Sequence, residues 1–331
     1  MSNETYFISR HDWEEFLRIL SRQAELWGLV SQKDRIVFVQ VKPTEVDRLI
    51  YNGIRSAQPV KTMFYPGRDK LTALNTSKKI IVGMKACDLG AMPLYDQVFL
   101  RDGLVDSFYQ ALKENIILVS ADCTEPGTNC FCTVIGLTPF AAKEFDLNIS
   151  QIAAGLLVET GSGKGKELIK TNQALFKNAE SGQIAERDKN RQNTSDRVKE
   201  INKEFNLSFD RTVKEHFDSP VWEKEAQPCV GCTACTNVCP TCHCFLLAEA
   251  DPETLSKIRL WDSCQYTGFA RVAGGANPRA KLAERFKNRY YCKYYYRPTK
   301  FNQIACTGCG RCIEACLGKI DKRKVIRELG R

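Results

Sequence analysis

The stretch from Cys229 to Cys316 opens with Cys229-Val-Gly-Cys232-Thr-Ala-Cys235-Thr-Asn-Val-Cys239-Pro240 and closes with Cys306-Thr-Gly-Cys309-Gly-Arg-Cys312-Ile-Glu-Ala-Cys316. In each run, two residues separate each of the first three cysteines from the next, and a fourth cysteine follows after three more residues. Thiolates at such short intervals on one loop are able to surround a single metal centre. Because the run occurs twice, the chain holds the ligands for two centres of the same kind.

This spacing is that of bacterial ferredoxins, in which three close thiolates hold three corners of an iron–sulfur cube and the fourth cysteine ligates the other cube. The crossing has a geometric reason, because the first three cysteines wrap one cube in a tight loop and the fourth starts a helix that points toward the neighbouring cube. We therefore expect two [4Fe-4S] clusters with crossed ligands. The first set is Cys229, Cys232, Cys235 and Cys316, and the second set is Cys306, Cys309, Cys312 and Cys239.

Zinc is the alternative metal for cysteines at this spacing, since thiolates also suit tetrahedral zinc. A zinc site, however, uses four ligands in two pairs and has no need of a third cysteine at the next two-residue step. The two complete runs therefore favour iron–sulfur clusters over zinc.

Length, charge and cysteine content limit the class of protein. The 331 residues allow two domains, and the formal net charge of +9 is moderate. Lys and Arg are interleaved with Asp and Glu, so we expect a solvated surface or an acidic protein partner and no nucleic-acid binding.

The start, Met1 to Tyr6, lacks the pattern of a secretory leader, and no apolar run approaches the roughly 18 residues of a membrane helix. We expect a cytoplasmic protein with reduced thiols and no membrane segment.

The first half of the chain alternates apolar strand patterns with helix patterns. An opening helix is indicated by a Ser9 and Asp12 cap followed by an apolar face at Trp13, Phe16, Leu17 and Leu20. The clearest strands are 35–41, 79–84 and 115–120, the helices between them are 44–54 and 89–99, and two further strands are 145–150 and 156–159. This alternation predicts an α/β domain with a mostly parallel sheet.

Two loops with cysteines follow strands of that sheet. Cys87 comes directly after the strand 79–84, and the segment Cys123-Thr-Glu-Pro-Gly-Thr-Asn-Cys130-Phe-Cys132 follows the strand 115–120. The carboxyl ends of neighbouring strands in an open α/β sheet face one crevice, where such folds place ligands. We therefore expect Cys87, Cys123, Cys130 and Cys132 to hold a third iron–sulfur cluster. The alternative is that they are buried free thiols, which pack as small hydrophobic groups.

The remaining chain divides into a connector and a cluster domain. Residues 178–217 are polar and rich in charge, which predicts a solvated helical connector. We place the α/β domain at 1–177, the connector at 178–220 and a mainly α-helical two-cluster ferredoxin domain at 221–331. Within the long insertion 241–305, the segments 245–250 and 279–293 are interpreted as helices.

The insertion contains four more cysteines, Cys242, Cys244, Cys264 and Cys292, which lack a ferredoxin rhythm. We interpret them as buried thiols close to the clusters. His243 lies among them, and either tunes a cluster by a hydrogen bond to sulfur or has only a packing role.

Other patterns do not identify a catalytic centre. Residues 160–166 (Thr-Gly-Ser-Gly-Lys-Gly-Lys) do not fit the register of a phosphate-binding loop and are interpreted as a turn before a helix. The aromatic and basic run 289–297 is typical of core and interface packing with its basic ends in solvent, although stacking on single-stranded bases is an alternative. There is neither a Ser-His-Asp order nor a motif of paired carboxylates, so we do not expect catalysis by this chain alone.

The motifs taken together resemble one family over nearly the whole chain. Cys239-Pro-Thr-Cys-His-Cys-Phe245, Trp261-Asp-Ser-Cys264, 273–279 (Ala-Gly-Gly-Ala-Asn-Pro-Arg) and the two cysteine loops of the first half resemble the iron–sulfur β subunits of sulfhydrogenase-type nickel–iron hydrogenases. They are also similar to the A subunit of anaerobic sulfite reductases and to subunits of heterodisulfide-reductase-linked complexes. Two features depart from the pattern: Leu317 follows Cys316 where proline is usual, and Cys292 stands where no cysteine is expected.

The resemblance implies an electron-transfer subunit that relays electrons between a flavin subunit handling NAD(P) and a separate catalytic subunit, either a hydrogenase, a sulfite reductase or a heterodisulfide-reductase-like enzyme. An alternative is a subunit whose own N-terminal crevice binds a flavin or a substrate, to which the clusters supply electrons. A zinc-stabilised nucleic-acid module is a third possibility, and it predicts a colourless protein. The sequence does not identify the terminal acceptor.

Overall fold

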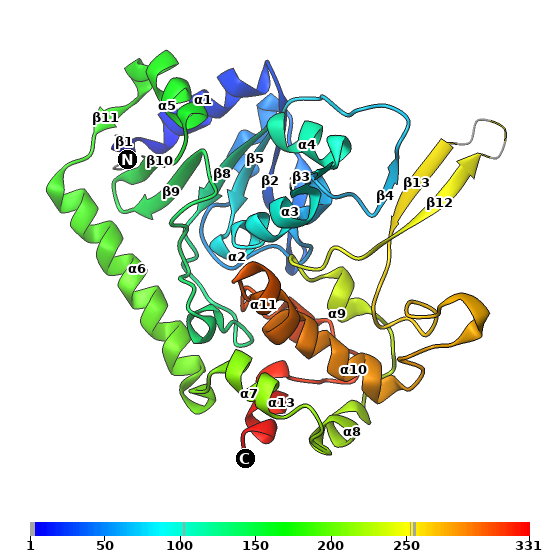
Figure 1. Cartoon of the computed structure of the whole chain (residues 1–331). Coiled ribbons are helices and arrows are strands. Elements are labelled where there is room, and N and C mark those ends of the chain that lie inside the picture. The colour runs from blue at the N-terminus through cyan, green and yellow to red at the C-terminus, as the bar shows by residue number, and fades with distance from the viewer. Residues whose placement is uncertain (1–3, 102, 252, 254–255) are drawn as a thin grey trace.

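The computed structural model of the chain describes residues 4–101, 103–251, 253 and 256–331 (Figure 1). Residues 1–3, which belong to the start of the chain discussed above, lie outside the described residues. A large sheet with its helices forms one end of the molecule, and shorter helices around the cysteine runs form the other. Within the described residues, no helix is both long and apolar enough to cross a lipid bilayer.

An eight-stranded mixed sheet organises the N-terminal half. Its order is β11-β1-β10-β9-β8-β5-β2-β3. The strands are β1 (Thr5–Ile8), β2 (Glu25–Gln32), β3 (Arg35–Gln40), β5 (Lys79–Met84), β8 (Ile116–Ala121), β9 (Leu147–Ile152), β10 (Gly155–Thr160) and β11 (Lys177–Asn178). The central strands β2, β5, β8 and β9 are parallel, whereas the pairs outside them are antiparallel. The α/β class is therefore confirmed, and the parallel part of the sheet is its centre.

The two faces of the sheet are covered by different helices. Along β5, Ile80 and Val82 pack with α1 (Arg10–Ser21) in one core, whereas Ile81 and Met84 belong to a second core with α3 (Met92–Phe99). Because side chains alternate along a strand, a continuous apolar strand such as β5 is buried on both faces. The predicted cap of α1 is present, since the Ser9 side chain accepts a hydrogen bond from the Asp12 N–H. The other helical segments of this half are η1 (Pro43–Arg48), η2 (Val60–Met63), α2 (Ala86–Leu89), α4 (Ser107–Glu114), η3 (Cys132–Ile135), α5 (Gly163–Thr171) and η4 (Gln173–Leu175).

The cluster half is mainly helical, as predicted. Its elements are α6 (Ser181–Ile201), η5 (Lys203–Phe205), α7 (Phe209–Glu215), α8 (Val221–Ala226), α9 (Ala234–Asn237), η6 (Ala273–Gly275), α10 (Leu282–Tyr291), the π-helical segment η7 (Cys292–Tyr296), α11 (Arg297–Phe301), α12 (Arg311–Glu314) and α13 (Lys322–Leu329). The tyrosines Tyr290, Tyr291 and Tyr294 are buried in its core. The packing interpretation is therefore confirmed for the tyrosines, but the expectation that the basic ends of the run reach solvent was wrong for Arg289, which is buried.

Two secondary-structure predictions were wrong. Residues 245–250, expected to be helical, lie in the strand β12 (Phe245–Asp251), which pairs with β13 (Ser256–Trp261). Strand β13 in turn pairs with β4 (Arg68–Lys70) of the N-terminal half, and a second small sheet is formed by β6 (Leu100–Arg101) and β7 (Leu104–Val105). Pairing in a hairpin that is itself anchored to the distant strand β4 outweighs local propensity. The predicted helix 44–54 is only the short 3-10 helix η1, followed by a loop.

The connector helix α6 runs along the outside of the molecule from the sheet toward the cluster half (Figure 1). It is polar, as expected, but it is also tied to the sheet, because Arg191 donates to Asp122 at 2.7 Å and pairs with Glu159. At its C-terminal end, the Asn202 amide donates to the Cys130 carbonyl at 2.7 Å. The connector therefore fixes the loop that carries Cys130.

A buried ion pair joins the two halves. The Arg311 guanidinium lies 2.8 Å from the Asp88 carboxylate, and the two side chains are only 1% and 2% exposed. Arg311 also donates to the Ser56 carbonyl at 3.0 Å. Asp88 follows Cys87 in the sequence, and Arg311 stands between Cys309 and Cys312. The ion pair therefore holds the loop of Cys87 in contact with the loop of Cys309 and Cys312.

Replacing Asp88 by asparagine should destabilise the chain by about 3–5 kcal/mol, because the buried Arg311 charge loses its partner. The matched control is Glu204→Gln, which removes the more exposed ion pair with Arg327 and should cost at most about 1 kcal/mol. Urea unfolding under anaerobic conditions measures both changes. Equal stability of the two variants would contradict a structural role for the buried pair.

Candidate metal centres

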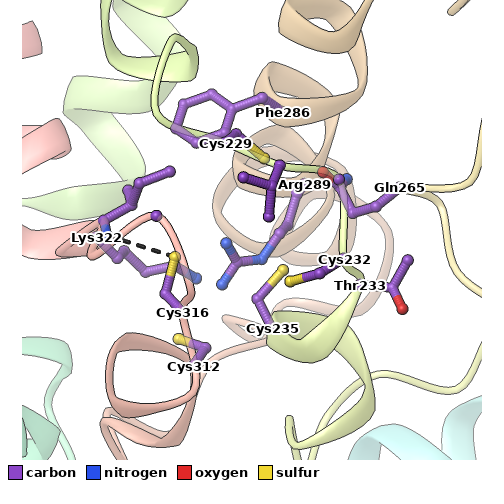
Figure 2. Close-up of a pocket in the computed structure, with 14 residues that line it drawn as sticks. Cys229, Cys232, Thr233, Cys235, Gln265, Phe286, Arg289, Cys312, Cys316 and Lys322 are labelled. Atoms are coloured by element: carbon purple, nitrogen blue, oxygen red, sulfur yellow. Dashed lines mark hydrogen bonds between the residues drawn. The ribbon is translucent and has the colours of Figure 1, made fainter.

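The first predicted ligand set lines one small cavity. Figure 2 shows Cys229, Cys232 and Cys235 on one side of it and Cys316 on the other. We call this space the ferredoxin cavity. Cys229 and Cys232 lie on the loop that leads into α9, Cys235 lies in α9 itself, and Cys316 follows α12. Cys312, which we assigned to the other cluster, also lines this cavity, so the two runs meet here.

Buried cations face the ferredoxin cavity without a protein anion beside them. The Arg289 guanidinium lies between Cys235 and Cys316 (Figure 2). Among the described residues, neither its Nε nor the Lys322 Nζ has a hydrogen-bond partner. Burial alone would lower the pKa of Arg289, but the thiolates of Cys235 and Cys312 raise it well above its ordinary value. Cations buried in this way require nearby negative charge, which thiolates bound to a cluster supply.

The second predicted set lies around the other run. Cys239, Cys306 and Cys309 are buried, and Cys239 is close enough to Cys309 to influence its pKa. The Lys293 ammonium donates to the Cys239 sulfur at 3.3 Å and to the Ala305 carbonyl, next to Cys306, at 3.1 Å. The structure therefore places Cys239 beside the second run and Cys316 beside the first, the arrangement that crossed ligands require.

Glycines let the second run approach the N-terminal half closely. Gly308 and Gly310 both have positive φ, at 62° and 75°. A Cβ on Gly308 would lie 2.5 Å from backbone atoms of Cys132, and one on Gly310 would lie 2.4 Å from the Asn129 carbonyl. The Phe131 N–H donates to the Gly308 carbonyl at 2.7 Å. Only glycine fits both the conformation and the space.

The third predicted set lines a second small cavity, which we call the loop cavity. It is lined by Cys87, Cys123, Cys130 and Cys132, together with Cys309 of the second run. Cys87 lies in α2 directly after β5, and the other three follow β8. The four cysteines therefore come together at the carboxyl ends of neighbouring parallel strands, as the open-sheet argument predicts.

The loop cavity is also positively charged. Lys85 is buried and donates to the carbonyls of Tyr51 at 2.6 Å and Asp122 at 2.9 Å. Arg55 donates to the Cys309 carbonyl at 2.5 Å and pairs with Glu314. Burial raises the pKa of Cys130 to about 11 and that of Cys132 to about 12. Free thiols here would stay neutral, whereas a bound cluster would deprotonate them and give the cations a partner.

The donor set fits iron–sulfur clusters. At each cavity the donors are thiols, the soft ligands that such clusters use. In the part of the chain that the structure describes, no three His, Cys, Asp or Glu side chains converge closely enough to hold a single metal ion.

Four cysteines that the sequence analysis left unassigned also share a cavity. Cys242, Cys244, Cys264 and Cys292 line one space beside the second run, which we call the insertion cavity. His243 lies in its wall, but its ring nitrogens contact the Thr241 carbonyl and the Arg297 guanidinium, not a sulfur. Burial and, to a smaller extent, the Arg297 charge lower the pKa of His243 to about 3. Both ring nitrogens of His243 therefore have protein partners, which favours the packing role over a hydrogen bond to a cluster.

Comparison with known proteins agrees with this description. Residues 228–320 match the family model described as a 4Fe-4S dicluster domain. The chain is also similar to sulfhydrogenase 2 subunit beta of Pyrococcus furiosus, with 32% identity over 330 residues that cover 95% of each chain. The two [4Fe-4S] clusters that the cysteine runs predict are thus supported independently of our spacing argument.

If the ligands cross as we expect, replacing Cys316 by serine should damage the cluster of the first run and spare more of the second. Replacing Cys239 should do the reverse. Redox titration followed by EPR of the reduced clusters separates the two signals in each variant. If Cys239→Ser abolished only the signal of the first run, the crossed assignment would be wrong.

The loop cavity predicts iron beyond the two ferredoxin clusters. Cys123→Ser should lower iron and acid-labile sulfide by about four atoms each per chain, while the EPR signals of the ferredoxin clusters persist. A suitable control is Thr138→Ala, which alters another residue lining the same cavity and should leave the iron count unchanged. Iron content that is unaffected by Cys123→Ser would rule out the third cluster.

Proposed function

The chain belongs to the family of iron–sulfur β subunits of sulfhydrogenases, and from this premise we propose that it relays electrons between two other subunits of a redox complex. As an iron–sulfur subunit of an oxidoreductase, it has an electron-transfer role. The finer proposal names the two subunits with which it exchanges electrons. One is a flavin subunit that binds NAD(P), and the other is a catalytic subunit. We further propose that it works in the cytoplasm, where its thiols stay reduced.

The observation that carries the proposal is the contact between cysteine sites. Cys312 of the second run lines the ferredoxin cavity, and Cys309 of the same run lines the loop cavity. The second run therefore lies between the two cavities and touches both. A [4Fe-4S] cluster supplies one-electron chemistry when it is bound. Cluster sites that lie next to one another in this way are suited to electron transfer through the protein. Isolated sites would suit a purely structural role for the metal.

An electron relay requires the protein to hold the cluster sulfurs in place, to exclude water and to supply positive charge. The side chains around the sites meet these requirements. Lys293 donates to the Cys239 sulfur, and the Ile320 N–H donates to the Cys316 sulfur at 3.4 Å. Hydrogen bonds to sulfur and buried cations favour the more negative, reduced form of a cluster and so raise its potential.

One end of this arrangement reaches the surface. Cys232 is exposed, and the neighbouring Val230 and Leu317 are 65% and 70% exposed. Leu317 occupies the position where the family pattern usually has proline. Apolar side chains around an exposed cluster ligand are suited to contact with a partner subunit. We propose that electrons enter or leave the chain at this face.

The alternative of a flavin or substrate in the N-terminal crevice receives less support. The crevice at the ends of β5 and β8 is the loop cavity, which is narrow and lined by thiols. Sites for small molecules typically enclose roughly 300–1,000 Å³. The crevice therefore suits a cluster better than a flavin.

The isolated chain should accept electrons from a strong reductant but should not turn over hydrogen, sulfite or NAD(P)H, because we assign no acid–base or nucleophile pair to it. Steady-state assays of the pure subunit, with and without copurified partner subunits, measure this. Turnover should appear only when the partners are present. Sustained turnover by the pure subunit, or a bound flavin in it, would contradict the relay proposal.

A further inference from the structure

The insertion cavity, with a volume of about 330 Å³, is larger than the ferredoxin cavity and the loop cavity. Its volume is about ten times the roughly 30 Å³ that a water molecule occupies in the liquid. Its four cysteines are Cys242, Cys244, Cys264 and Cys292. The thiols therefore form a cluster and are not scattered through a core.

Separate elements bring these cysteines together. Cys242 and Cys244 lie on the loop between α9 and β12, and Cys264 follows the end of β13. Cys292 begins the π-helical segment η7, which interrupts the helix between α10 and α11. Such π-helical turns are rare and occur frequently at functional sites. The irregular helix and the hairpin thus meet at one space lined by sulfur.

The charges around the insertion cavity match those at the other sites. It is lined by the cations Arg279, Arg289, Lys293, Arg297 and Lys300 and by one acid, Asp262. The buried Lys293 donates to the Cys242 sulfur at 3.4 Å as well as to the Cys239 sulfur at 3.3 Å. Lys293 therefore bridges the insertion cavity and the second ferredoxin set, just as Arg289 lines both the insertion cavity and the ferredoxin cavity.

We propose that Cys242, Cys244, Cys264 and Cys292 hold a further [4Fe-4S] cluster. As each sulfur binds an iron atom, its thiol releases one proton to solvent, and the buried cations then face an anion. The number of cysteines agrees with this assignment, because the chain has sixteen, and four clusters with four ligands each use all of them. This proposal rests on the insertion cavity and does not depend on the relay function.

Two other occupants fit less well. A single zinc ion needs four sulfurs about 2.3 Å from one point, and in the described residues no such convergence exists. Simple free thiols would leave the buried cations Arg289 and Lys293 facing neutral sulfurs, with Asp262 as the single acid in the wall. An organic anion suits the volume and the charge, but it gives no reason for four cysteines in the wall.

The test compares the full chain with three variants, all purified anaerobically. Cys264→Ala and Cys292→Ala remove one ligand each, while Asn288→Ala changes another residue of the cavity wall and serves as the control. With all four clusters present, wild type and control should contain about sixteen iron and sixteen sulfide atoms per chain, and each cysteine variant should contain about four fewer of both. The EPR signals of the ferredoxin clusters should persist in every variant, which shows that the chain has folded.

Should the alanine variants fail to fold, Cys264→Ser and Cys292→Ser replace sulfur by oxygen in nearly the same shape and carry the same comparison. A loss of about four irons supports the proposal whatever the occupancy of the loop cavity, because the comparison is with wild type. Iron content equal in wild type and the cysteine variants would overturn it. So would one zinc ion, or an organic chromophore, that is lost from those variants in place of iron.

Discussion

The attraction between buried cations and cysteine thiolates is the interaction on which the structure depends. Arg289 and Lys322 face the ferredoxin cavity, Lys85 faces the loop cavity, and Lys293 contacts the sulfurs of Cys239 and Cys242. Burying so many cations would be strongly unfavourable without anions beside them. Metal binding keeps the thiolates deprotonated and supplies those anions, so the folded cluster half and its clusters stabilise each other.

This interdependence also explains how the two halves of the chain are joined. The second run contacts the loop around Cys130 through Gly308 and Gly310, and Arg311 within it pairs with Asp88 beside Cys87. Strand β13 of the insertion pairs with β4 of the first half. The halves therefore share both a sheet and their metal-binding loops, and each cysteine set lies against a neighbouring one.

Much of this was predictable from local sequence. The ferredoxin spacing predicted two [4Fe-4S] clusters, and the position of Cys87 and Cys123 after apolar strands indicated that distant cysteines would meet. The four cysteines of the insertion were not grouped, because Cys264 and Cys292 reach the cavity through a hairpin and a π-helical turn that have no signal at short range. For the same reason the segment at Phe245 was expected to be a helix, although pairing with β13, which is itself held by β4, makes it a strand.

The central claim is that this chain stores and passes single electrons on clusters and has no other redox group. The most direct test is an anaerobic reductive titration of the pure full-length chain, in which the electrons taken up are compared with the iron content. Our account predicts one electron for about every four iron atoms, with cluster absorbance bleaching throughout. Uptake well above that ratio, or a two-electron step with the absorbance of a flavin, would contradict it.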